Sequence, residues 1–172
     1  MRARLTRLRL VPLLIGVTIL AALSCAATGW WWINAATGSE AGAATARDAA
    51  ESAGENAVAT LTTANFATAG ADLRRWEEVT TGPLLDQIRS GHEQGVEALQ
   101  NAKSVTSGRV LDAALSRLDT QAGTAELLAV VEINTKQGAG EPAVKRNRFQ
   151  ATVTRTPHGW KLSALQPVIV AL

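Results

Sequence analysis

The apolar stretch of residues 10–33 constrains this chain more than any other feature of its sequence. It holds no charged residue over 24 positions. At a rise of ~1.5 Å per residue, a helix of this length covers roughly 36 Å. The hydrocarbon core of a bilayer is about 30 Å thick. The stretch therefore predicts a transmembrane helix over residues 10–33.

The residues on either side of this stretch predict its orientation. Four arginines precede it with no acidic residue among them: Arg2, Arg4, Arg7 and Arg9. Positive charge at the end of a span keeps that end in the cytoplasm. Three consecutive tryptophans close the stretch, and their amphipathic rings suit the membrane–water interface: Trp30, Trp31 and Trp32. We expect a cytoplasmic tail at residues 1–9, one pass through the cell membrane, and an extracytoplasmic remainder.

Two alternatives to an uncleaved anchor stay open. A basic start, an apolar middle and small residues near Ala26–Ala27 are also the parts of a cleaved secretory signal. Against this, the apolar stretch is longer than the usual range of about 7–15 residues and continues into the tryptophans. A lipoprotein signal acylated at Cys25 fits Ser24 before it, but Ala22 is a poor match. All three alternatives export the remainder of the chain.

Composition excludes several classes of function for that remainder. Four of the 17 basic residues precede the span, which leaves 13 against 15 acidic residues, a net charge of −2. Nucleic-acid binding requires a basic face, and none is visible here. Cys25 is the only cysteine, and His92 and His158 are far apart in sequence, so we predict no disulfide, no metal and no cofactor.

The first part of the remainder reads as helical. Residues 34–43 are small and polar and predict a juxtamembrane linker, followed by one domain over 44–172. An alanine-rich helix is predicted from residue 44 to about 66. Its first half has little to bury and is expected to project, whereas the half from Ala57 should dock. A second helix is predicted over 72–80. A third begins at Pro83 and is weakened by Gly91 and Gly95.

The second part reads as strands. Residues 104–118, 125–133, 143–156 and 160–164 are the predicted strands, with turns at 119–123 and 156–159. The strand over 125–133 is apolar on both faces, which is typical of a central strand. The strand over 143–156 alternates, with Phe149, Ala151 and Val153 on one face and with Arg146 and Arg148 on the other. The predicted fold class is α+β, with three helices packed against the concave face of a four-strand antiparallel sheet.

Three motifs accompany this topology: Thr-Gly-Pro-Leu-Leu-Asp at 81–86, Ser-Gly-Arg-Val-Leu-Asp-Ala-Ala-Leu at 107–115, and Thr-Pro-His-Gly-Trp-Lys-Leu-Ser-Ala-Leu-Gln-Pro-Val at 156–168. With the basic start and single span, they resemble the Mce-associated membrane proteins of actinobacteria. The resemblance implies a cone-shaped domain of the nuclear-transport-factor-2-like (NTF2-like) or cystatin-like kind outside the membrane. It also implies an accessory role that stabilises an Mce complex importing lipids or sterols. Mce subunits and possible lipid contacts are then the implied partners.

A second resemblance in topology stays open as the alternative function. Assembly components of secretion or conjugation machines, of the VirB8-like or TcpC-like kind, also have a short cytoplasmic tail, one span and a similar outer domain. Under either alternative, the partner is a membrane complex.

The sequence offers little that predicts catalysis. It contains no tyrosine and no Gly-x-Ser-x-Gly motif. His92 stands in a polar patch and His158 in a turn, so neither has an evident carboxylate partner. Three further carboxylates also lack an evident partner: Asp112, Asp119 and Glu132. We therefore predict a protein that is not an enzyme.

Two groups of residues are candidate contact sites. Lys145, Arg146 and Arg148 form the densest basic cluster after the span, which predicts either a solvated strand face or contact with lipid headgroups or an acidic partner. Three aromatic residues are expected either to fill the core or to line an apolar cleft: Trp76, Phe149 and Trp160.

Overall fold

The computed structural model describes residues 42–168. The predicted transmembrane helix, its flanking arginines and tryptophans, and Cys25 lie outside the described residues. Within 42–168, none of the helices combines the length and the apolar composition that crossing a bilayer requires. The chain divides into two compact units, Met1–Ala44 and Thr45–Leu172. The second unit contains the whole sheet.

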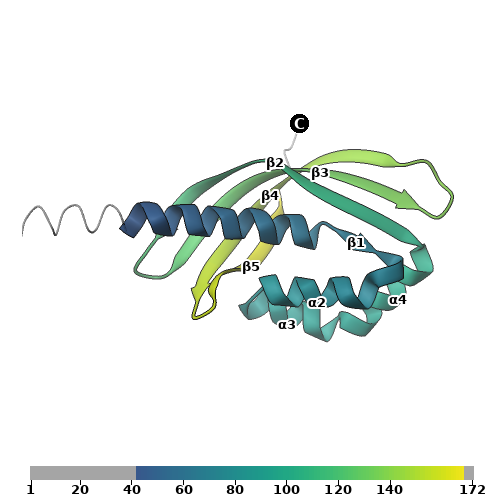
Figure 1. Ribbon diagram of the computed structural model, residues 1–172, viewed down its shortest axis with the longest axis horizontal. Coiled ribbons are helices and arrows are strands. Elements are labelled where there is room, and N and C mark those ends of the chain that lie inside the picture. The colour runs from purple at the N-terminus through teal and green to yellow at the C-terminus, as the bar shows by residue number, and fades with distance from the viewer. Residues whose placement is uncertain (1–41, 169–172) are drawn as a thin grey trace, which may run out of the picture. The chain divides into compact units, whose positions relative to one another are not determined.

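The sheet is antiparallel throughout, and its strands follow the order of the chain. Five strands make it up: β1 (Ala64–Asn65), β2 (Ser104–Asp119), β3 (Thr124–Gln137), β4 (Ala143–Thr156) and β5 (Gly159–Pro167). The helical elements are a first helix described over residues 42–61, η1 (Phe66–Thr68), α2 (Ala69–Val79), α3 (Gly82–Ser90) and α4 (His92–Ala102). Figure 1 shows the sheet curled over the helices. The predicted α+β cone is confirmed, with the two-residue β1 as an additional edge strand.

The first helix docks on the sheet earlier than the sequence predicted. Ala50 is fully buried and Arg47 donates a hydrogen bond to the carbonyl of Leu115 at 3.2 Å. A Cβ added to Gly54 would lie 2.8 Å from Cδ2 of Leu127. The expectation that the first half projects is therefore wrong from Ala50 onward. Small residues bury little area, but they allow the helix backbone to approach the sheet closely.

The core lies between this helix and the inner face of the sheet, which is the face turned toward the helices. Its largest fully buried apolar side chains come from the first helix, β3, β4 and β5: Val58, Leu127, Val131, Val153 and Leu162. Fully burying an aliphatic side chain of this size stabilises a fold by about 1.5–3 kcal/mol. The core therefore ties the N-terminal helix to the three C-terminal strands.

The predicted third helix is two helices. α3 ends and α4 begins at Gly91, whose N–H donates to the carbonyl of Gln87 at 3.1 Å. A glycine inside a helix costs about 1 kcal/mol relative to alanine, so it is a weak point at which a change of direction is cheap. The sequence located this weak point but did not predict that the helix ends there.

β3 is the central strand, as predicted, but only one of its faces is buried. Ala125, Leu127, Ala129 and Val131 are buried toward the helices, whereas Leu128 is 49% exposed. All helices described here lie on the side of the inner face (Figure 1). The apolar residues on the other side of β3 therefore meet no covering element within 42–168.

Candidate interaction surface

The face of β2, β3 and β4 that points away from the helices is called the outer face here. Three large apolar side chains on it are strongly exposed: Leu111 at 40%, Leu128 at 49% and Val144 at 59%. Strand alternation places Val144, Arg146 and Arg148 on this face, because Phe149, Ala151 and Val153 point inward. Exposed apolar groups among charged ones are typical of surfaces that bind other proteins.

Glu132 joins three strands across the outer face. Its Oε1 lies 3.3 Å from Nη2 of Arg109 on β2, and its Oε2 lies 3.3 Å from Nε of Arg146 on β4. The sequence showed no partner for Glu132, and that inference was wrong. Exposed ion pairs of this kind stabilise a fold by about 0–1 kcal/mol. Their effect here is to hold the Arg146 side chain along the sheet.

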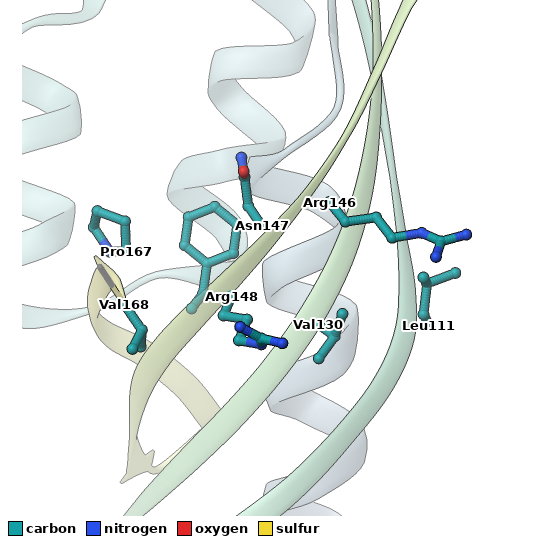
Figure 2. Close-up of a pocket in the computed structure, with 8 residues that line it drawn as sticks. Leu111, Val130, Arg146, Asn147, Arg148, Pro167 and Val168 are labelled. Atoms are coloured by element: carbon teal, nitrogen blue, oxygen red, sulfur yellow. The ribbon is translucent and has the colours of Figure 1, made fainter. Parts of the chain in front are cut away.

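A cleft of about 590 Å³ opens where β5 ends beside β4. Figure 2 shows Arg146 reaching along the outer face toward Leu111, with Arg148 beside Val130. The cleft is lined by Leu111, Val130, Arg146, Asn147, Arg148, Phe149, Pro167 and Val168. Two guanidinium groups and no carboxylate are among these lining side chains. An anionic group with an apolar neighbour matches this chemistry.

The backbone of β4 beside this cleft lacks a second partner strand. The ladder between β4 and β5 ends at the pair Phe149 and Pro167, followed by a 2.8 Å hydrogen bond from the N–H of Val168 to the carbonyl of Arg148. Residues 143–147 pair with β3 on one side. On their other side, no strand of the described part of the chain pairs with them. This stretch is called the open edge.

The predicted basic cluster is divided by the sheet. Arg146 and Arg148 lie on the outer face, whereas alternation places Lys145 on the inner side of the strand, opposite Ile133. Lys145 lines a separate hollow with Glu141. The expectation of one strand face carrying all three charges was therefore wrong, since adjacent strand residues point to opposite faces.

The three aromatic candidates occupy different places. Trp160 is partly buried and packs against the core, and Phe149 does the same while also lining the cleft of Figure 2. Trp76 lies in a second hollow of about 260 Å³ between the helices and β5, lined mainly by apolar side chains such as Leu73 and Leu165. Its ring N–H donates to the carbonyl of Thr63 at 3.2 Å.

The structure contains a histidine–carboxylate pair that sequence reasoning missed. Nδ1 of His92 lies 2.9 Å from Oε1 of Glu77, and Nε of Arg89 lies 3.5 Å from Oε2 of the same carboxylate. Glu77 thus ties α2 to α3 and α4, and none of these residues lines the hollows described above. His92 and Glu77 are 15 residues apart, so no local pattern in the sequence indicated that they pair. Among residues 42–168, no group of three or more metal-ligating side chains is suited to hold an ion.

Several solved structures are similar in fold to this chain. The periplasmic domain of DotI is 17% identical with a TM-score of 0.57, covering 69% of this chain and 92% of that one. An IcmL-like type IV secretion system protein from Legionella pneumophila is 11% identical with a TM-score of 0.56, covering 71% and 93%. CagV from Helicobacter pylori, a VirB8 homologue, is 9% identical with a TM-score of 0.55, covering 70% and 97%. These likenesses show a shared NTF2-like fold. No family model matches the chain, and no curated protein matches it in sequence.

Proposed function

We propose that this protein is a non-catalytic assembly component of a membrane-anchored protein complex, with residues 44–172 forming its extracytoplasmic interaction domain. The observation that carries the proposal is the outer face, where Leu111, Leu128 and Val144 are exposed around an arginine-lined cleft. The sequence of residues 1–33 supports attachment to the membrane by a single span. In that arrangement the domain meets its partners at a raised effective concentration.

A VirB8-like role in a secretion or conjugation apparatus is the form of this proposal that the comparisons favour. The similar folds include a VirB8 homologue and an IcmL-like type IV secretion protein. An accessory role for an Mce lipid importer is the competing form, which rests on the sequence motifs and draws no support from a family model.

A non-catalytic role is supported by the position of the one histidine–carboxylate pair found among the described residues. A general base must reach the proton it abstracts from a bound substrate. The His92–Glu77 pair instead connects three short helices and lies apart from the clefts described above. We propose that it holds these helices together.

Co-purification from native membranes tests the proposal. Full-length tagged protein should retain other envelope proteins after mild crosslinking, identified by mass spectrometry. Leu128→Glu should reduce this retention, whereas Gln121→Glu, which introduces the same charge in the exposed β2–β3 turn, should not. Secretion components among the retained proteins would support the VirB8-like role. Mce subunits among them would instead support the accessory role for an Mce lipid importer. If no envelope protein is retained, the proposed function is wrong.

Topology is tested separately. A reporter that is active only outside the cytoplasm should be active when fused to the C-terminus, and the mature protein should retain Arg2. Recovery of a soluble form beginning near Ala27 would contradict the anchor.

A further inference from the structure

We propose that the open edge of β4, residues 143–147, binds an extended acidic segment of a partner protein as an added β-strand. This inference rests on the proposed function, because it identifies which part of the interaction domain makes the contact and which partner chemistry it selects.

The backbone of the open edge is ready to pair. The carbonyl of Arg148 points toward the β5 side, where it accepts the N–H of Val168. In a strand, every second residue directs its N–H and C=O to the same side, so Arg146 and Val144 present theirs to the open side. At ~3.4 Å per residue the open edge is about 17 Å long, which accommodates a peptide of about five residues. Adding a strand to such an edge is a common mode of peptide recognition.

The neighbouring edge of β5 is protected, and this contrast singles out β4. The N–H of Thr81 donates to the carbonyl of Leu162 at 2.8 Å, so the chain itself covers part of the outer edge of β5. Pro167 at the end of β5 has no N–H to offer a further strand. The open edge has neither a proline nor a bulge within it. Within residues 42–168, nothing comparable protects the open edge.

The side chains beside the open edge select for negative charge. Arg146 is paired with Glu132, whereas no carboxylate of the described residues forms an ion pair with Arg148. Both guanidinium groups line the cleft, which has no carboxylate in its wall. An added strand with acidic side chains on the outer face would place a carboxylate beside Arg148. Phe149, Pro167 and Val168 offer apolar contacts to alternate residues of that strand.

Charge also argues against a second copy of this chain as the occupant. Pairing two open edges would bring the basic side chains of one copy, Lys145, Arg146 and Arg148, close to those of the other copy. Like charges opposite one another across a strand pair are destabilising, and basic side chains on edges are a common protection against self-association. The same charges that oppose self-pairing attract an acidic partner.

The test uses the full-length protein in detergent and a fluorescent octapeptide of alternating glutamate and valine. Fluorescence anisotropy should show binding of this peptide and none of the lysine–valine analogue. Arg148→Glu should weaken binding about tenfold, because it removes one charge pair and adds repulsion. Val144→Pro should also weaken it, because it removes an N–H that faces the open side. Arg155→Glu is the matched control, since it makes the same change at the paired end of β4.

Each outcome decides the inference. Equal binding of the glutamate–valine peptide by the wild type, Arg148→Glu and Val144→Pro would overturn the inference. Absence of peptide binding by a chain shortened after Val168 would also overturn it. If only the shortened chain binds, residues 169–172 compete for the open edge, and the edge still takes a strand. If the protein self-associates and Val144→Pro abolishes this self-association, the occupant of the open edge is a second copy of this chain and not an acidic partner. If the peptide fails while envelope proteins still co-purify with Val144→Pro, this inference is wrong and the proposed function stands.

Discussion

The peptide N–H of Val168 donates to the carbonyl oxygen of Arg148 at 2.8 Å, which is the last described contact between β5 and β4. Before this point β4 has a strand on each side, and beyond it, toward Ala143, β3 is the one strand of residues 42–168 that pairs with β4. One strand thus contributes both to the buried core, through Val153, and to an accessible edge. The difference in the lengths of β4 and β5 creates the proposed binding site.

The open edge makes a prediction that needs no ligand. Val144→Pro should change the free energy of unfolding by no more than about 0.5 kcal/mol, because the lost N–H faces no partner strand. Val153→Pro should cost about 3 kcal/mol or more, because it breaks the ladder inside the core. Thermal unfolding of the full-length protein measures both. A large loss for Val144→Pro would mean that its N–H is paired.

Neighbouring leucines on β3 test whether the sheet is covered on one face only. Leu127→Ala should cost about 2–5 kcal/mol, since Leu127 is fully buried and its removal leaves a cavity. Leu128→Ala should cost less than about 1 kcal/mol, since Leu128 is 49% exposed. The free energies of unfolding of the two variants are compared directly. Equal losses would contradict an uncovered outer face.

Close approach at Gly108 predicts an intolerant position. The N–H of Gly108 donates to Oγ1 of Thr63 at 3.1 Å, and a Cβ added at Gly108 would overlap the side chain of Thr62. Gly108→Ala should therefore cost about 1–3 kcal/mol through overpacking. Gly70→Ala in α2 has only the end of the Arg74 side chain nearby, at 3.8 Å. Gly70→Ala should instead stabilise the fold by up to about 1 kcal/mol. Thermal unfolding of the two variants should therefore show changes in the free energy of unfolding of opposite sign.

Asp72 organises the connection between the first helix and α2. Asp72 is buried, with 5% of the residue exposed. Its Oδ2 accepts hydrogen bonds from the N–H of Asn65 at 2.9 Å and from Oγ1 of Thr68 at 2.8 Å. Asp72→Ala should cost about 3 kcal/mol, because it leaves these donors without an acceptor. Arg75→Ala should cost less than about 1 kcal/mol, because the arginine is 64% exposed. Hydrogen exchange of the Asn65 amide should rise only in the first variant.

Much of the fold was predictable because it follows from local periodicity. The alternation over 143–156 and the turn residues at 119–123 predicted the strands and their order, and the structure confirms the strand at Ala143–Thr156. The same alternation predicted that Arg146 and Arg148 share a face. The expectation that Lys145 shares this face was wrong because the three basic residues were grouped by their closeness in sequence, whereas adjacent strand residues point to opposite faces.

What the sequence by itself determined is the class of fold, the central strand and the facing of the residues of β4. Each depends on the spacing of residues within one segment. Only the tertiary structure decided that the first helix docks from Ala50, that Glu77 pairs with His92, and that Glu132 joins Arg109 to Arg146. It also decided that β5 pairs with β4 only as far as Pro167 and that, among residues 42–168, β3 is the sole strand paired with β4 from there to Ala143. These relationships join residues far apart in the chain, and they depend on strand register, relative strand length and how closely two backbones can approach.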